Sequence, residues 1–176
     1  VRVPMQELGT TWPGWSVLFL PVMHNITLAN RKRIQCGPLI DHNKERDLTQ
    51  DWVSKLTIRT PSTQTLCCSL SGGNQQKVVL AKWLNAQSQV LILDHPTRGL
   101  DVESSRWIWE QILARCAVGT AVLFISADLD ELVTYSDRIL VFYAGQVTEV
   151  PDARSVSVDE LGHLIGGQRV REEAAP

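Results

Sequence analysis

Short apolar runs alternate with helical patterns along the second half of the chain, and this alternation restricts the fold more than any other feature. Residues 89–93 and 121–125 are almost entirely apolar, as strands of a parallel sheet are when both faces are buried. Between them, apolar residues recur along 103–117 with the period of an amphipathic helix. Two further runs, 138–143 and 146–150, follow. This order predicts an α/β fold with a mainly parallel sheet.

The first half of the chain is expected to be mostly helical. Apolar positions become dense over residues 17–30, which end in a basic turn, and a second helix is predicted for 43–56. Residues 58–68 contain a proline and several hydroxyl side chains, which is typical of a connecting loop. A largely buried helix then begins after Ser71, with this serine as its N-cap.

Charge and composition exclude several classes of function. Seventeen Lys and Arg against 19 Asp and Glu give a net charge of -2, so no overall field directs the chain to nucleic acid or to an anionic membrane. The longest apolar stretch near the N-terminus, residues 15–23, is much shorter than the roughly 20 residues of a membrane span, so no direct insertion is expected. The cysteines show no C-x-x-C spacing, which favours a reducing compartment over a disulfide or zinc framework; they are Cys36, Cys67, Cys68 and Cys116.

The segment L-S-G-G-N-Q-Q-K at residues 70–77 is the strongest sign of a binding site. Two glycines at a helix start leave backbone N–H groups accessible, with the positive end of the helix dipole behind them, so the segment predicts an anion site. A glycine-tolerant helix start without a ligand explains Ser71, Gly72 and Gly73 equally well when they are taken alone.

A second group of candidate residues follows the strand at 89–93. Asp94 is placed at the C-terminal end of that strand, where a carboxylate can hold a magnesium ion, usually through water. Residues 96–101, P-T-R-G-L-D, form a turn whose acid could contact a facing subunit. Trp107, on the polar side of the 103–117 helix, is a modest candidate for a partner contact. Taken singly, each feature is better explained as a turn, a helix cap or an exposed side chain.

Together these motifs resemble the second nucleotide-binding half of the tandem ABC-type ATPases that drive sugar or nucleoside importers. The resemblance is most specific over residues 60–145. It implies a truncated P-loop NTPase-like core with a mainly parallel sheet and a helical signature subdomain. The segments that carry it are L-S-G-G-N-Q-Q-K at 70–77, V-L-I-L-D-H-P-T-R-G-L-D at 90–101, V-L-F-I-S-A-D-L-D-E-L at 122–132 and S-D-R-I-L-V-F at 136–142.

We also expect the chain to divide into four parts. Residues 1–15 would be an irregular N-terminal segment, and 16–88 a helical subdomain with the signature loop and helix. Residues 89–150 would form the α/β core with the Walker B, D-loop and switch regions, and 151–176 a C-terminal tail.

Each motif has a role in the family that it resembles. Asp94 is similar to the Walker B aspartate, which holds magnesium through water, and Ala127 stands at the degenerate switch position where many ABC ATPases have a histidine. The D-loop, which crosses the interface between two halves, is resembled by Gly99, Leu100 and Asp101. The signature loop closes over the γ-phosphate of an ATP held by the opposite half, and its counterparts are Leu70, Ser71, Gly72, Gly73, Asn74 and Gln75.

The sequence departs from the family pattern in two places. No Walker A motif G-x-x-x-x-G-K-[ST] occurs in these 176 residues, and that loop supplies the amides and the lysine that hold the β- and γ-phosphates. His95 occupies the usual position of the catalytic glutamate, and an imidazole reaches differently from a carboxylate, so we do not expect it to be an efficient base. The isolated chain is therefore predicted to be inactive, with an unfilled gap or an exposed sheet edge beside residues 121–125, where the Walker A strand would lie.

The leading hypothesis is a partial nucleotide-binding domain of an ABC importer, which couples ATP hydrolysis to sugar or nucleoside uptake and donates its signature loop in trans. It would use ATP and Mg²⁺ with another ABC ATPase half that supplies Walker A. It would lie in the cytoplasm on the inner face of the cell membrane against a permease subunit, without a nucleic-acid partner. The alternative is a catalytically dead ABC-like interaction or regulatory protein. Nucleotide binding by the isolated chain would favour the first hypothesis, and partner binding without nucleotide the second.

Overall fold

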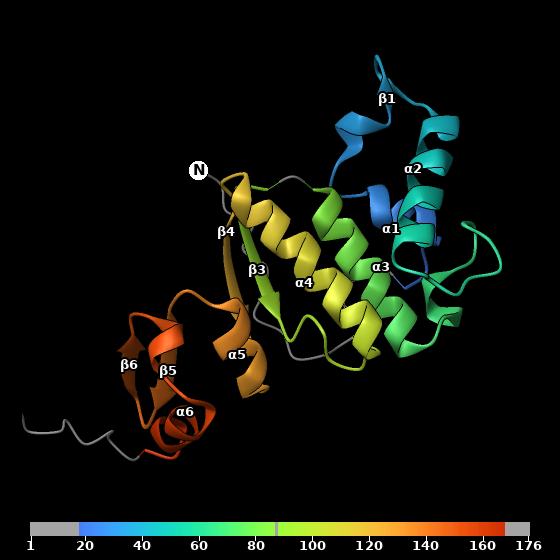
Figure 1. The fold of residues 1–176 in the computed structure, drawn as a ribbon. Helices are drawn as coiled ribbons and strands as arrows, with labels where there is room; N and C mark the ends of the chain where they lie inside the picture. The colour runs from blue at the N-terminus through green and yellow to red at the C-terminus, as the bar shows by residue number, and fades with distance from the viewer. Residues whose placement is uncertain (1–17, 87, 168–176) are drawn as a thin grey trace, which may run out of the picture. The chain divides into compact units, whose positions relative to one another are not determined.

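The computed structural model describes residues 18–86 and 88–167, which form two compact units, one through Ile125 and one from Ser126 (Figure 1). The predicted irregular segment 1–15 lies outside the described residues. The division at residues 88 and 150 stays a prediction.

The first unit begins with a short helix that starts at a proline. α1 (Val22–Thr27) follows Pro21, and the N–H groups of Val22 and Met23 donate to carbonyl oxygens of residues 65 and 63 at 2.9 and 3.0 Å. The helix predicted over 17–30 is therefore too long, because Pro21 extends the chain with ψ 153° immediately before the helix. The neighbouring α2 (His42–Lys55) agrees with the predicted helix at 43–56.

A small hairpin separates these two helices, where sequence analysis expected only a basic turn. The 3₁₀ turn η2 (Arg31–Arg33) leads into β1 (Gln35–Cys36), which pairs antiparallel with β2 (Leu39–Ile40). Gly37 connects the strands with φ 61°, a backbone conformation that glycine adopts without steric cost.

Buried polar side chains join the helices of this unit. The hydroxyl of Thr27 in α1 donates to the Glu45 carboxylate of α2 at 2.8 Å, although both side chains are almost fully buried. Asn85, the last residue of α3 (Gly72–Asn85), donates to the backbone oxygen of Ile26 at 3.2 Å. Buried polar groups are costly unless they are paired, so these bonds select one arrangement of α1, α2 and α3.

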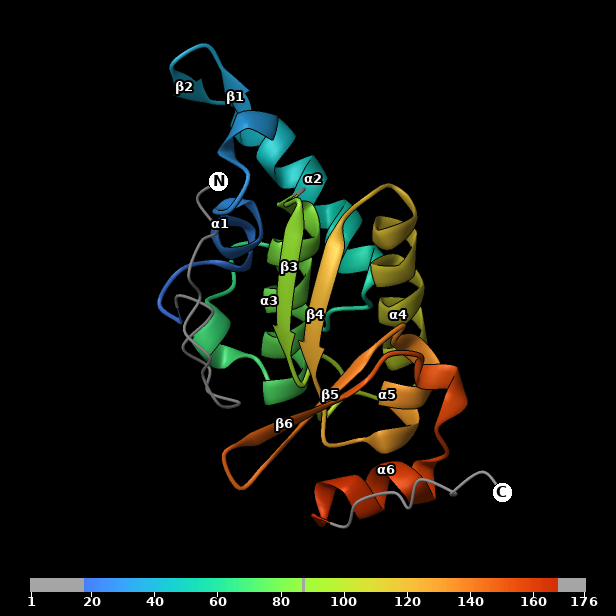
Figure 2. The same ribbon diagram turned by 90° about the vertical axis from the view of Figure 1, so that its left-hand side faces the viewer.

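The sheet of the first unit contains two parallel strands. β3 (Val90–Asp94) pairs with β4 (Ala121–Ile125) in the register Val90 to Ala121 through Asp94 to Ile125. The connecting helix α4 (Val102–Ala117) packs on β4, with the Trp109 ring 4.7 Å from the Phe124 ring. Figure 2 shows α3 and α4 on the same side of the two strands.

The other side of this sheet is open in the described part of the chain. Leu123 and Ile125 of β4 are 52% and 41% exposed, and among the described residues β4 pairs only with β3. This agrees with the exposed edge expected beside 121–125.

The second unit is a small α/β layer with its own core. β5 (Ile139–Tyr143) and β6 (Gln146–Val150) pair antiparallel through a turn in which Ala144 and Gly145 both have positive φ. The last two predicted strands are thus a hairpin and not part of the parallel ladder. Its core residues are Ile139, Val141, Val150, Ala153 and Leu161. Its elements are α5 (Leu129–Tyr135), β5 (Ile139–Tyr143), β6 (Gln146–Val150), η4 (Ala153–Ser155) and α6 (Val158–Ile165).

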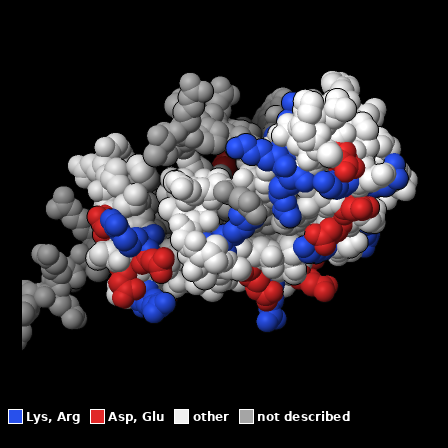
Figure 3. Space-filling view, turned by 90° about the horizontal axis from the view of Figure 1, so that it is seen from above, with Lys and Arg blue, Asp and Glu red and all other residues white. Residues whose placement is uncertain are grey.

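Charges of both signs lie side by side on the face drawn in Figure 3, in keeping with the small net charge of -2. Along the described ranges, no helix combines the length and the apolar character that crossing a bilayer requires.

Candidate functional site

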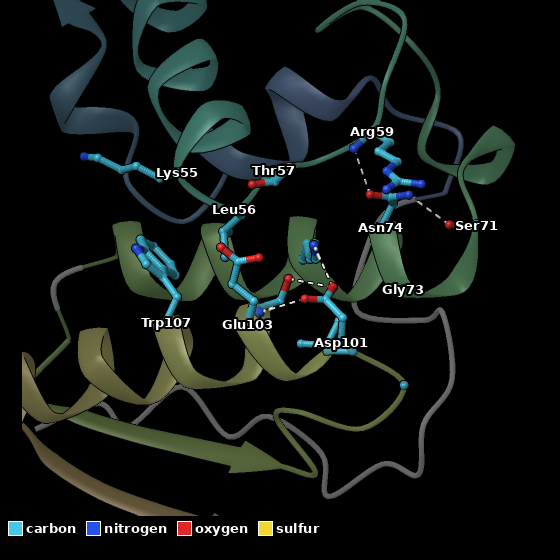
Figure 4. Close-up of a pocket in the computed structure, with 14 residues that line it drawn as sticks. Lys55, Leu56, Thr57, Arg59, Ser71, Gly73, Asn74, Asp101, Glu103 and Trp107 are labelled. Atoms are coloured by element: carbon cyan, nitrogen blue, oxygen red, sulfur yellow. Dashed lines mark hydrogen bonds and ion pairs between the residues drawn. The ribbon is translucent and has the colours of Figure 1, made fainter.

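A cavity of about 570 Å³ in the first unit is lined by three of the six predicted signature residues and by all three predicted D-loop residues. The predicted signature residues Leu70, Gly72 and Gln75 do not line it. The signature residues come from the start of α3 and the D-loop residues from the turn between β3 and α4 (Figure 4). The cavity thus unites two motifs that lie more than 20 residues apart in the sequence. Lining residues from these motifs are Ser71, Gly73, Asn74, Gly99, Leu100 and Asp101.

The N-terminus of α3 is open to an outside ligand. Ser71 and Gly72 are exposed, and a Cβ placed on Gly72 would meet no atom within 4 Å. Ser71 stands at the N-cap position, but its hydroxyl accepts no hydrogen bond from the helix backbone, which corrects the expected serine cap. Its oxygen instead accepts from Nδ2 of Asn74 at 2.9 Å. The first N–H groups of α3 therefore lack a serine cap, and the helix dipole favours an anion in front of them.

The polar side chains that follow the two glycines hold this loop in place. Asn74 Oδ1 accepts from the N–H of Arg59 at 2.8 Å, and Gln75 Nε2 donates to the backbone oxygen of Leu70 at 2.9 Å. Gln76 Nε2 donates to the carbonyl oxygen of Pro96 at 3.4 Å. Asn74 and Gln75, predicted as ligand-contacting residues, thus also have internal partners that fix the backbone of the loop.

Asp101 begins α4 and faces the cavity. One carboxylate oxygen accepts from the N–H of Ser104 and the other from its hydroxyl, both at 2.8 Å. These two bonds, helped by the nearby Lys77 ammonium group, lower the pKa of Asp101 to about 2. The side chain remains 62% exposed, so a charged carboxylate is available at the surface where the D-loop prediction places a partner contact.

Two further cavity residues, Lys77 and Arg59, were not assigned to the site from the sequence, and Trp107 was considered only as a candidate for a partner contact. Lys77 extends from α3 to within 3.6 Å of Asp101, and Arg59 offers its backbone N–H to Asn74. Trp107 is partly buried and projects with Glu103 from α4 into the cavity (Figure 4), so it does not lie on a fully exposed polar face. Lys77 could have been selected because it is the only charged residue of the 70–77 motif.

Asp94 and His95 lie outside this cavity, at the end of β3. His95 Nε2 is 3.8 Å from Asp94 Oδ1, and each side chain is about one quarter exposed. The N–H of His95 donates to the carbonyl oxygen of Ile125 at 2.8 Å. Over residues 18–86 and 88–167, no group of three His, Cys, Asp or Glu side chains is arranged to hold a metal ion. Asp94 can thus supply a single carboxylate to a magnesium ion, which would take its other ligands from water and phosphate.

Ala127, the predicted switch position, belongs to the second unit and is exposed. The preceding Ser126 Oγ donates to Glu131 at 2.8 Å and accepts from the N–H of Asp128 at 3.0 Å. Asp128 in turn caps α5, so this segment is fixed within its own unit. A methyl side chain at 127 has no hydrogen-bonding group to offer a phosphate.

Comparison with solved structures identifies the class of fold. A dimeric post-hydrolysis state of the ATP-binding cassette MJ0796 bound to ADP and Pi matches with a TM-score of 0.66 at 20% identity, over 79% of this chain and 59% of that one. A structure of the ATP-binding subunit of an ABC transporter matches with a TM-score of 0.68 at 20% identity, over 85% of this chain and 63% of that one. The fold is therefore that of an ABC-type ATPase cassette, a P-loop NTPase fold.

Sequence comparison then identifies the family. Residues 12–98 match the sequence model of the ABC transporter family. The ribose import ATP-binding protein RbsA of Rhodopirellula baltica is 42% identical over 82% of this chain, and its counterpart from Bacillus subtilis is 38% identical over 84%. The chain belongs to the ATP-binding proteins of ABC transporters. It spans 28% and 30% of the lengths of these two relatives.

Proposed function

We propose that the chain is part of the ATP-binding subunit of an ABC importer for a sugar or nucleoside, and that it contributes its signature loop to a nucleotide held by another ABC ATPase half. The observation that carries this proposal is the open N-terminus of α3. Its first N–H groups have no serine cap, and Ser71, Gly73 and Asn74 line the same cavity as the D-loop residues. A γ-phosphate presented from outside would meet amides and the positive end of a helix dipole.

The cofactors follow from the same arrangement. The 176 residues hold no Walker A motif, so the cradle for the β- and γ-phosphates would come from the opposite half. Mg²⁺ would contact this chain through the Asp94 carboxylate. ATP and Mg²⁺ are thus expected at a composite site, with the chain turning over little ATP by itself.

The partners in this proposal are a Walker A-bearing ATPase half and a membrane permease, with the complex on the cytoplasmic side of the membrane. The names of the relatives, which include ribose import ATP-binding proteins, support the importer class. The charged, exposed carboxylate of Asp101 supports an interface at the 99–101 loop.

The test is ATP turnover after mixing the chain with a nucleotide-binding half that carries Walker A, taken from the Bacillus subtilis ribose import ATP-binding protein. Ser71→Arg places a long cation in front of α3 and is expected to abolish any stimulation of turnover. Ser54→Arg is the matched control, because Ser54 is exposed on α2 and does not line the cavity. Equal turnover with wild type and Ser71→Arg would rule out the trans role.

A second candidate function is a catalytically dead interaction or regulatory protein. It is favoured by His95, which stands where the family has a glutamate and faces Asp94 at 3.8 Å. Native mass spectrometry of the same mixtures separates the two. The regulatory function is supported if the wild-type chain forms a stable complex with the partner half both with and without nucleotide. In that case the chain leaves the ATP turnover of the partner half unchanged or lowers it.

A further inference from the structure

Lys77 is a nearly buried lysine beside the proposed phosphate site. It lies on α3, just beyond the first turn, and its side chain is only 10% exposed. A buried ammonium group is unfavourable unless an opposite charge compensates it. Its Nζ atom is 3.6 Å from Oδ2 of Asp101, which is the only carboxylate in the described part of the chain within ion-pair distance of it.

Asp101 serves two elements at once. Its bonds to the N–H and hydroxyl of Ser104 begin α4, and its contact with Lys77 ties the same carboxylate to α3. The Ser104 bonds are local to α4 and do not involve α3. Lys77 therefore provides a charged connection between the end of the D-loop turn and the helix carrying the signature loop.

Two other contacts connect the same segments. A Cβ at Gly73 would lie 3.3 Å from the carbonyl oxygen of Gly99, so the two backbones approach closely. Gln76 Nε2 donates to the carbonyl oxygen of Pro96 at 3.4 Å. Both contacts are neutral, and the hydrogen bond is long, so the ion pair is the charged link of the three.

We propose that Lys77 is a positioning residue that holds the Gly99–Asp101 turn against α3, so that the phosphate-facing amides and the partner-facing turn act as one rigid surface. The proposal rests on the trans role given above. Without the ammonium group, Asp101 keeps its bonds to Ser104 and α4 still begins normally, but the turn loses its charged link to α3 and keeps only the neutral contacts of Gln76 and Gly73. A nucleotide-bearing half would then meet a mobile turn and a correctly folded signature loop.

The first measurement is amide hydrogen exchange of residues 97–101 in the full chain, which needs neither ATP nor a partner. Lys77→Gln is expected to speed this exchange about fivefold, since it removes a partly buried link without removing a helix cap. Lys77→Arg should restore slow exchange. Asp101→Asn serves as a second variant, because asparagine still caps a helix but cannot compensate Lys77, and it should also speed exchange.

Lys44→Gln is the matched control. Lys44 lies 3.8 Å from Asp41, the N-cap of α2, so it makes the same kind of pair with a helix-capping aspartate. In that pair Lys44 is exposed and Asp41 is half-buried, and both belong to one helix and its cap, away from the cavity. Its loss should leave exchange over 97–101 and turnover unchanged.

The second measurement is turnover in the mixture described above, at increasing concentrations of the chain. Lys77→Gln is expected to lower the maximal rate about tenfold with little change in the concentration of chain giving half the maximal rate, and Lys77→Arg should recover most of it. Unchanged exchange in both Lys77→Gln and Asp101→Asn would overturn the proposal. So would normal turnover by Lys77→Gln in a mixture where Ser71→Arg abolishes it. If the mixture with Ser71→Arg also turns over ATP normally, the trans role itself fails. Faster exchange of residues 97–101 in Lys77→Gln would then still establish the link between Lys77 and the turn.

Discussion

Oε1 of Glu45 lies 3.0 Å from Nδ1 of His24, which connects the buried carboxylate of α2 to α1. Thr27 donates to the same oxygen, and His42 lies 3.3 Å from the other one. Burial by itself would raise the pKa of Glu45, but the hydrogen bonds from His24, Thr27 and His42 outweigh it and lower that pKa below 4.5.

The lowered pKa of Glu45 predicts a loss of stability in acid. In the unfolded chain this carboxyl takes up its proton near its ordinary pKa, and in the folded chain only at lower pH. Its contribution is therefore complete above about pH 4.5 and is lost as the pH falls through the folded pKa. Glu45→Gln should show a flatter fall in unfolding free energy below pH 4.5, measured by urea denaturation. Glu110→Gln removes an exposed carboxylate of α4, so its unfolding free energy should fall with pH as steeply as that of wild type.

The close approach of Gly73 to Gly99 predicts that alanine is tolerated better at Gly72 than at Gly73. Alanine favours a helix over glycine by up to about 1 kcal/mol, and at Gly72 the added methyl group meets open space. At Gly73 the methyl group would press on the Gly99 carbonyl at 3.3 Å, which offsets that gain. Gly73→Ala should therefore be less stable than Gly72→Ala by about 1 kcal/mol in urea unfolding. Equal stability of the two variants would show that the Gly99 loop moves away freely.

Truncation of the Asn85 side chain to alanine is expected to lower the unfolding free energy strongly. Its Nδ2 donates to the Ile26 oxygen at 3.2 Å, its Oδ1 accepts from Arg33 at 2.9 Å, and the side chain is fully buried. Asn85→Ala leaves these partners without their bonds and should cost about 1–3 kcal/mol of unfolding free energy. Asn43→Ala, at an exposed position on α2, should change it by less than about 0.5 kcal/mol. Chemical denaturation followed by circular dichroism compares the two.

The burial of Cys67 predicts that thiol reagents modify it more slowly than the other three cysteines. It is fully buried, and burial, with a smaller contribution from Cys68, raises its pKa to about 11, whereas Cys36, Cys68 and Cys116 are exposed. A thiol reagent at pH 8 should modify three thiols quickly and the fourth only after unfolding, since the thiolate is the reactive form. Cys68→Ser should reduce the fast group from three to two. Rapid modification of Cys67, detected by peptide mass spectrometry, would contradict its burial.

Helices and strands were predicted correctly from the sequence where their apolar pattern extends over many residues. The helices at α2, α3 and α4 and the strands at β3 and β4 agree with the predicted ranges to within a few residues, because their apolar periods extend over whole elements. The hairpin of β1 and β2 was missed because strands of two residues show no period. Gly37 and Pro38, which follow the basic turn, mark the tight turn of this hairpin.

The candidate site was predicted in its motifs but not in its internal connections. The sequence indicated the glycines of the α3 start and the aspartate of the D-loop. It could not indicate that Ser71 would bond Asn74 and leave the helix backbone uncapped, or that Lys77 would reach Asp101. Such contacts depend on how α3 meets the β3–α4 turn in space, and one sequence carries no direct signal of that distance. The roles assigned to Asp94, His95 and Ala127 stay predictions.

The main chain at His95 has φ 46°, in the left-handed region that few side chains adopt. Asparagine, aspartate and histidine tolerate this conformation better than glutamate, for which it costs about 1–2 kcal/mol. A carboxylate base engineered at this position must therefore first tolerate the positive φ of the main chain. The shorter aspartate would keep the present course of the chain, whereas glutamate would tend to reshape the bend after β3.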